Sequence, residues 1–192
     1  MAVRMRPDER REHICRCALT VITRDGFQAT TTRSIAEQAG ITHSLLHRYF
    51  ANRDELVATA FDVAATEEIA RFDDELSRID DLDARLAWLC EPVDRPHYQL
   101  WIDAWGEASR NPALRASLRR HHRSWRRAVT ALLASGAAAG RWRCEDPELT
   151  ADRILAAFDG NAVQHYVFHH ISAATHRRRN AQAVDELLGR RL

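Results

Sequence analysis

Residues 31–53 read TTRSIAEQAGITHSLLHRYFANR, and this stretch predicts the fold of the N-terminal part of the chain. Its spacing predicts two short helices joined by a tight turn. Ala36 is small where the helices must touch, and Gly40 occupies the turn, where a left-handed backbone favours glycine. Leu46 returns an apolar side chain to the shared core, and the Thr42 hydroxyl can cap the second helix. This pattern is typical of a helix-turn-helix, whose second helix enters the major groove of DNA.

The residues on either side extend this pattern. Apolar residues repeat at helical spacing from Ile14 to Ile22, Gly26 ends that predicted helix, and another helix begins near Arg53. Segment 10–61 therefore resembles the N-terminal domain of the TetR family of bacterial repressors. The resemblance is carried by Gly26, Thr31-Thr32-Arg33, Ile35-Ala36, Ala39-Gly40-Ile41, Leu46, Tyr49-Phe50, Arg53 and Leu56.

The resemblance implies a set of DNA contacts. Thr32 would bind a phosphate and Arg33 a guanine edge. The chain departs from the family pattern at two positions, where His47 replaces the usual Tyr and Arg53 replaces the usual Lys. Both replacements can still donate hydrogen bonds. The alternative is a set of merely solvated polar residues, and Leu46 and Phe50 are expected in the core. The full expected contact set is Thr32, Arg33, Thr42, His43, Ser44, Leu45, His47, Tyr49 and Arg53.

Composition favours an all-α protein of two domains. The chain has 192 residues with only 7 Gly and 5 Pro, and it has no long alternating Val/Ile/Thr run. Its net charge is only +1, yet residues 1–53 hold nine Arg against five acidic residues, a local excess suited to phosphate binding. We expect a three-helix DNA-binding domain at 1–53 and a helical ligand-binding and dimerisation domain at 54–192.

The cysteine positions and the hydropathy of the chain bear on the cellular compartment in which the protein is expected. Cys15 and Cys17 would point to different sides of one helix, which is poor geometry for a disulfide or a shared metal. We find no N-terminal apolar targeting segment and no run long enough to span a membrane. We therefore expect a reduced, cytoplasmic protein with no membrane partner.

Beyond residue 53 the chain reads as a series of helices. We expect them at 54–78, 82–91, 96–108, 112–135, 147–171 and 180–190, with a loop region from Gly136 to Trp142. This part resembles the regulatory domain of the choline- and betaine-responsive repressors of the TetR family. Regulatory domains share a fold while their ligands differ, so the effector is not identified. The residues that carry this resemblance are Trp101-x3-Trp105, Asn111-Pro112-x-Leu114, Trp125, Gly136-x3-Gly140 and Asp159-Gly160.

Four aromatic residues form the candidate ligand site. Tyr98, Trp101 and Trp105 share a helical face, and Trp125 can meet them from the next helix. Such a pocket could take a cation or a flat apolar ligand, and ordinary core packing is the alternative interpretation. His165 and His169 stand at metal-binding spacing but have no further ligands beside them, so we expect neither a metal nor a cofactor.

The helix expected at 147–171 is apolar over more than one face, and a surface helix needs only one. The surplus predicts an isologous homodimer interface through this helix and the last one. The expected interface residues are Ile154, Phe158, Tyr166, Val184 and Leu188.

These features favour a repressor released from double-stranded operator DNA by a small-molecule effector. No nucleophile–base pair, phosphate-binding loop or metal cluster stands out, so we expect no enzymatic activity. The alternative is a small-molecule-binding or enzymatic helical protein with an incidental helix-turn-helix.

Overall fold

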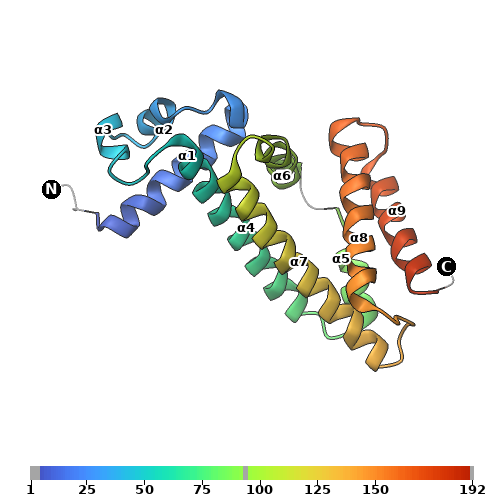
Figure 1. The fold of residues 1–192 in the computed structure, drawn as a ribbon. Coiled ribbons are helices and arrows are strands. Elements are labelled where there is room, and N and C mark those ends of the chain that lie inside the picture. Colours follow the sequence, from blue (N-terminus) through green and yellow to red (C-terminus); the bar gives the residue numbers. More distant parts are fainter. Residues whose placement is uncertain (1–4, 93–94, 191–192) are drawn as a thin grey trace. The chain divides into compact units, whose positions relative to one another are not determined.

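The computed structural model describes residues 5–92 and 95–190, and their regular elements are all helical. This confirms the all-α prediction. The helices, drawn in Figure 1, are α1 (Pro7–Ala29), α2 (Thr32–Gln38), α3 (His43–Leu46), α4 (Arg53–Ser77), α5 (Leu82–Leu89), α6 (Arg95–Ala108), α7 (Pro112–Ala138), α8 (Pro147–Ala162), the π-helical turn η1 (Val163–Val167) and α9 (Ala173–Leu187).

The chain folds into two compact units. The N-terminal unit consists of residues 1–68 and 100–121, and the C-terminal unit consists of residues 69–99 and 122–192. Helices α4, α6 and α7 each contribute residues to both units. No helix of the described residues combines the length and apolar character that crossing a membrane requires.

The N-terminal unit is built on the apolar stripe of α1. Ile14, Ala18 and Val21 of that stripe are fully buried, and they pack in one cluster with Ile35 of α2 and Phe61 of α4. Burial of large aliphatic and aromatic side chains contributes about 1.5–3 kcal/mol each, so this cluster stabilises the arrangement of α1, α2 and α4.

The helix-turn-helix forms as the sequence predicts. Gly40 adopts a φ of 63°, the left-handed conformation expected of the turn. The Thr42 hydroxyl accepts a 3.2 Å hydrogen bond from the backbone N–H of Leu45 and caps α3. Leu46 and Phe50 are buried in the core of the unit. Each of these contacts is local in sequence, which is why the motif could be predicted.

The C-terminal unit has a separate core. Phe72 of α4 meets the Trp125 ring of α7 at a centroid distance of 4.5 Å, and it also contacts Trp88 of α5. Ile154 of α8 and Val184 of α9 are buried in the same cluster. Figure 1 shows α8 and α9 side by side along their length.

One predicted helix end is confirmed and another is wrong. Gly26 interrupts α1 with a non-helical φ of 78° and ψ of 164°, and only a short turn beyond it extends α1 to Ala29. Gly136 does not begin a loop, because α7 continues to Ala138. A Cβ atom at Gly136 would stand only 1.7 Å from the Trp142 ring, so this glycine serves a close approach inside a helix.

The predicted boundary between the last two helices is also wrong. The helix that begins at Pro147 passes into a π-helical turn at Val163 and ends at Val167, and His169 then takes a φ of 52°. The last helix begins at Ala173, where the Ser172 hydroxyl caps it by accepting a 3.2 Å hydrogen bond from the Thr175 N–H. The predicted start at residue 180 missed this serine cap.

Candidate functional site

The expected DNA contacts lie in or beside α2 and α3, except Arg53, which is the first residue of α4. The side chains of Arg33, His43, Ser44 and His47 are exposed, as is that of Thr42 at the start of α3. Thr32, Leu45, Tyr49 and Arg53 are half-buried. The structure therefore brings one continuous set of these residues to the surface of the helix-turn-helix.

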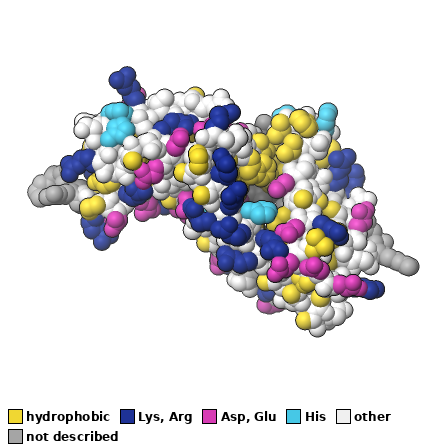
Figure 2. All heavy atoms as spheres, in the orientation of Figure 1, with side chains coloured by type: hydrophobic (Ala, Val, Ile, Leu, Met, Phe, Trp, Pro, Cys, Tyr) yellow, Lys and Arg dark blue, Asp and Glu magenta, His cyan; other side chains and the backbone are white. Residues whose placement is uncertain are grey.

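Two histidines of this surface contact each other. The Nε2 atoms of His43 and His47 lie 3.2 Å apart, and the two rings meet edge to face with a centroid distance of 4.4 Å. The hydroxyl of Thr32, on α2, lies 2.9 Å from the same Nε2 atom of His43. Figure 2 shows histidine side chains on the surface over α3.

Arg53 has a role that the sequence argument did not foresee. Its guanidinium donates to the Thr30 carbonyl at 2.8 Å and to the carboxylate of Glu107 on α6 at 2.9 Å, and it also bonds the Phe27 carbonyl and Asp54. The Glu107 side chain is only 8% exposed. Arg53 thus holds the C-terminal end of α1, the first turn of α4 and α6 together, and nothing in the local sequence signals this.

The four expected ligand-site aromatics fall into different clusters. Trp101 packs on Phe61 at 5.0 Å in the N-terminal unit and donates its indole N–H to Glu68 at 2.7 Å. Trp105 is a half-buried residue of the same unit. In the C-terminal unit Trp125 packs on Phe72, whereas Tyr98 stacks on Tyr166 with a centroid distance of 5.1 Å.

A carboxylate lies beside the two stacked tyrosines. The Tyr98 hydroxyl donates a 3.3 Å hydrogen bond to Asp159 of α8. Burial raises the pKa of the Asp159 carboxyl, while the Tyr98 hydrogen bond and the neighbouring His122 oppose that rise. Among the described residues no arginine forms an ion pair with Asp159, so its charge is poorly compensated.

Two histidines complete this cluster, which we call the Tyr98–Asp159 cluster (Tyr98, Asp159, His165, Tyr166 and His176). The His165 ring packs on Tyr166 at 4.5 Å and lies 5.3 Å from His176. His176 is 1% exposed, and its Nδ1 atom has no hydrogen-bond partner. Burial and the neighbouring His165 lower the pKa of His176 to about 4. Sequence spacing could not reveal this cluster because its members come from α6, α8, η1 and α9.

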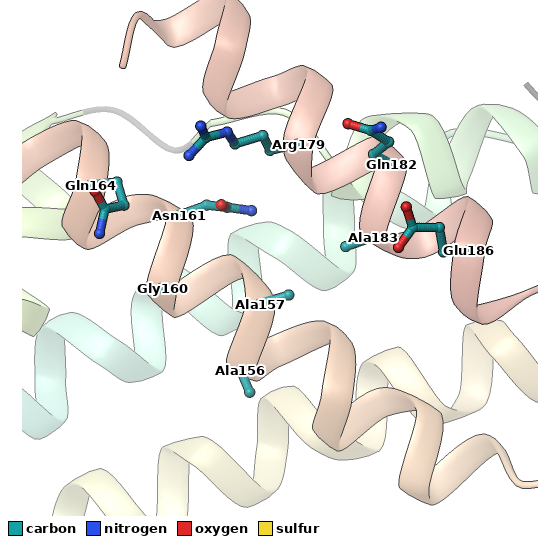
Figure 3. A pocket seen from close by; sticks show the side chains of 9 residues that line it. All are labelled: Ala156, Ala157, Gly160, Asn161, Gln164, Arg179, Gln182, Ala183 and Glu186. Atoms are coloured by element: carbon teal, nitrogen blue, oxygen red, sulfur yellow. The ribbon is translucent and has the colours of Figure 1, made fainter. Parts of the chain in front are cut away.

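The expected interface residues are placed mainly inside the chain. Ile154, Tyr166, Val184 and Leu188 are buried within the C-terminal unit, and Phe158 is half-buried. The outer face of α8 and α9 instead carries an open groove of small and polar side chains (Figure 3). Its lining residues are Ala156, Ala157, Gly160, Asn161, Gln164, Arg179, Gln182, Ala183 and Glu186.

Arginines gather over α7 in Figure 2, and several form ion pairs. Arg120 lies 2.7 Å from Asp62 of α4, and that carboxylate also accepts hydrogen bonds from Ser117 and His121. Arg126 pairs with Glu148 and Asp152 of α8. No group of three or more His, Cys, Asp or Glu residues suited to a metal occurs in the described part of the chain.

Comparison with known proteins agrees with this architecture. The family profile described as "Bacterial regulatory proteins, tetR family" matches residues 14–60, and that of the "BetI-type transcriptional repressor, C-terminal" domain matches residues 78–189. The HTH-type transcriptional regulator YfiR of Bacillus subtilis is 20% identical over 171 residues, which cover 84% of this chain and 82% of YfiR.

Solved structures share the fold. A transcriptional regulator of Saccharomonospora viridis in complex with choline superposes with a TM-score of 0.81 at 23% identity, over 93% of this chain and 96% of that one. A TetR-family regulator of a Rhodococcus species has a TM-score of 0.78 at 24% identity, over 94% and 99% of the two chains. With an N-terminal helix-turn-helix and a C-terminal domain that both match, the chain belongs to the TetR family of transcriptional regulators, with a regulatory domain of the BetI type.

Proposed function

We propose that the chain is a homodimeric repressor that binds operator DNA and is released by a small organic cation. The observation that carries the DNA-binding part is the exposed set on α2 and α3, with Arg33, His43 and Ser44 at the surface of a folded helix-turn-helix. Such a chain acts by binding rather than by catalysis. Since bacterial operators lie in the cytoplasm, the protein would act there.

The effector site that we propose is the Tyr98–Asp159 cluster. A desolvated carboxylate without an arginine partner is costly, and a bound cation would compensate it. Tyr98 and Tyr166 stack on each other, so a cation would contact a ring face turned away from the pair, and such a cation–π contact is typically worth about 0.5–2 kcal/mol. The choline complex of the Saccharomonospora viridis regulator, which shares the fold, supports a cationic effector.

The dimer surface that we propose is the groove on the outer face of α8 and α9. Ala156, Ala157 and Gly160 on α8, with Ala183 on α9, keep the backbones accessible to a second helix pair. A two-fold interface would place two recognition helices on successive half-sites of a near-palindromic operator.

A binding assay tests the cationic effector. Choline and its neutral isostere 3,3-dimethyl-1-butanol are added to the protein, and the melting temperature and the affinity for the DNA upstream of its own gene are measured. We expect choline alone to raise the melting temperature, by an amount equivalent to about 2.7 kcal/mol at a hundredfold excess over its dissociation constant. Choline should also weaken DNA binding, because coupling between effector and operator is reciprocal.

Equal effects of the two compounds would contradict the charge argument. Absence of binding to the upstream DNA at low salt would contradict the repressor proposal itself.

A further inference from the structure

We propose that His43, His47 and Thr32 form a site for a divalent transition-metal ion on the DNA-reading surface, and that metal and operator compete for it. The competition rests on the DNA-binding role proposed above, whereas the site itself rests on geometry alone. Its side chains come from α2 and from α3 with its C-terminal cap residue His47, and the two imidazoles are exposed to solvent.

The backbone sets the two histidines at the spacing that chelation needs. His43 is the first residue of α3 and His47 follows one helical turn later, with its N–H bonded to the His43 carbonyl at 3.2 Å. Side chains at i and i+4 share one face of a helix. The pairing of the two rings is therefore a consequence of helical geometry.

The distances fit a shared ion. With zinc–nitrogen bonds of about 2.0–2.1 Å and tetrahedral angles, two imidazole nitrogens on one ion stand about 3.3–3.4 Å apart. The Nε2 atoms of His43 and His47 are 3.2 Å apart. The separation of the two nitrogens is therefore close to that of two imidazole ligands on one ion.

Three polar side-chain atoms converge at this point of the surface. The Nε2 atom of His43 faces both the Thr32 hydroxyl and Nε2 of His47. A neutral imidazole nitrogen carries either one proton or one lone pair, so it can serve only one of these partners well. A Lewis acid placed among the three atoms would accept a lone pair from each.

The ligand set indicates which ions would bind. Imidazole suits Zn²⁺, Ni²⁺ and Cu²⁺, whereas Mg²⁺ and Ca²⁺ prefer carboxylate and carbonyl oxygens. Two imidazoles and one hydroxyl leave at least one position open to water, so the ion would be weakly held and exchangeable rather than structural. An occupied site would hold both Nε2 atoms against the metal and remove them from the DNA bases and phosphates.

Calorimetry on the full chain, freed of metal with EDTA and then desalted, tests the site without DNA. ZnCl₂ and NiCl₂ are titrated into the wild type and into His43→Gln and His47→Gln. The control is the double variant His169→Gln/His170→Gln, which changes two exposed histidines of the C-terminal unit. We expect at least tenfold weaker binding in the first two variants and wild-type binding in the control; binding unchanged in His43→Gln and His47→Gln would overturn the site.

A second arm tests the competition. Fluorescence anisotropy with the upstream DNA should show that saturating ZnCl₂ weakens DNA binding by the wild type at least tenfold and that EDTA reverses this effect. The His169→Gln/His170→Gln control should respond to ZnCl₂ as the wild type does. In His47→Gln, ZnCl₂ should leave DNA binding unchanged. Tighter or unchanged DNA binding in ZnCl₂ would overturn the competition. If the metal-free wild type does not bind the DNA at all, it is the repressor proposal that fails, and calorimetry still decides the site.

Discussion

At the scale of single residues, Arg33 and Arg53 carry the same charge in different surroundings. Arg33 is exposed on α2, whereas the Arg53 guanidinium is engaged by two backbone carbonyls and two carboxylates. An arginine that reads DNA must be free to reach a base or a phosphate. An arginine that holds helices together must instead keep its hydrogen bonds within the protein. The two should therefore separate in mutational experiments.

We expect Arg53→Ala to destabilise the protein by about 1–3 kcal/mol, because it leaves the Glu107 carboxylate and two carbonyls without their donor. Arg33→Ala should leave the free energy of unfolding unchanged and weaken operator binding by about 1–3 kcal/mol. Urea unfolding and DNA anisotropy measure the two effects. In the control, Glu107→Gln combined with Arg53→Ala should cost less than the sum of the single changes; strict additivity would contradict the ion-pair role.

Asp159 is the residue where proposed function and stability oppose each other. Since burial raises the pKa of its carboxyl, the charged form is unfavourable in the free protein. Asp159→Asn should therefore stabilise the effector-free protein by about 0.5–2 kcal/mol and abolish its response to choline. Thermal unfolding with and without choline measures both. The matched control is Asp152→Asn, which removes an exposed carboxylate paired with Arg126 and should leave the choline response intact; a choline response in Asp159→Asn equal to that of the wild type would contradict the site.

At the scale of elements, sequence succeeded where contacts are local. The turn at Gly40, the Thr42 cap and the burial of Leu46 follow from residues within one short stretch, and all three were predicted. The Tyr98–Asp159 cluster could not be predicted, because the two residues are 61 positions apart and only the fold brings them together. The end of η1 was missed because the left-handed residue there, His169, is not a glycine.

Gly136 shows how one glycine allows two distant segments to approach. We expect Gly136→Ala to destabilise the protein by about 1–3 kcal/mol, because its Cβ would overlap the Trp142 ring. The matched control is Gly106→Ala on α6, where a Cβ meets nothing within 4 Å and should stabilise the helix by about 0.5–1 kcal/mol. Chemical denaturation measures both. If Gly136→Ala proved as stabilising as the control, α7 and Trp142 would not be in contact.

His176 should make the contact between η1 and α9 sensitive to pH. Its pKa is about 4 in the folded chain, against an ordinary value of 6.5, so the unfolded chain binds more protons between these values. The contribution of His176 to stability is therefore complete above pH 6.5 and is lost as the pH falls toward 4. Denaturant unfolding should show that the free energy of unfolding falls more between pH 7.5 and pH 5 in the wild type than in His176→Gln. Equal losses in the two proteins would contradict this assignment.

At the scale of the whole molecule, the two compact units are joined by α4, α6 and α7, each of which has residues in both. Tyr98 of the proposed effector site and Glu107, which holds Arg53, lie on one helix, α6. A ligand shifts DNA binding only by as much as its affinity differs between the two states of the protein. Effector and operator must therefore weaken each other by the same factor, whatever the path of coupling.

Dimerisation should contribute more to operator affinity than any single base contact. Ala156 is exposed on α8 and lines the groove that we propose as the interface, so Ala156→Arg should leave each chain folded and disrupt the dimer. Two linked recognition helices gain about 10²–10⁴ in avidity over one, and the variant should lose operator affinity by that factor. Sedimentation and DNA anisotropy measure the two effects, and Ala134→Arg, at an exposed alanine of α7 outside the groove, is the matched control. Choline should still stabilise Ala156→Arg, because the Tyr98–Asp159 cluster lies within one chain. If Ala156→Arg stays dimeric and binds the operator as tightly as the wild type, the dimer interface lies elsewhere.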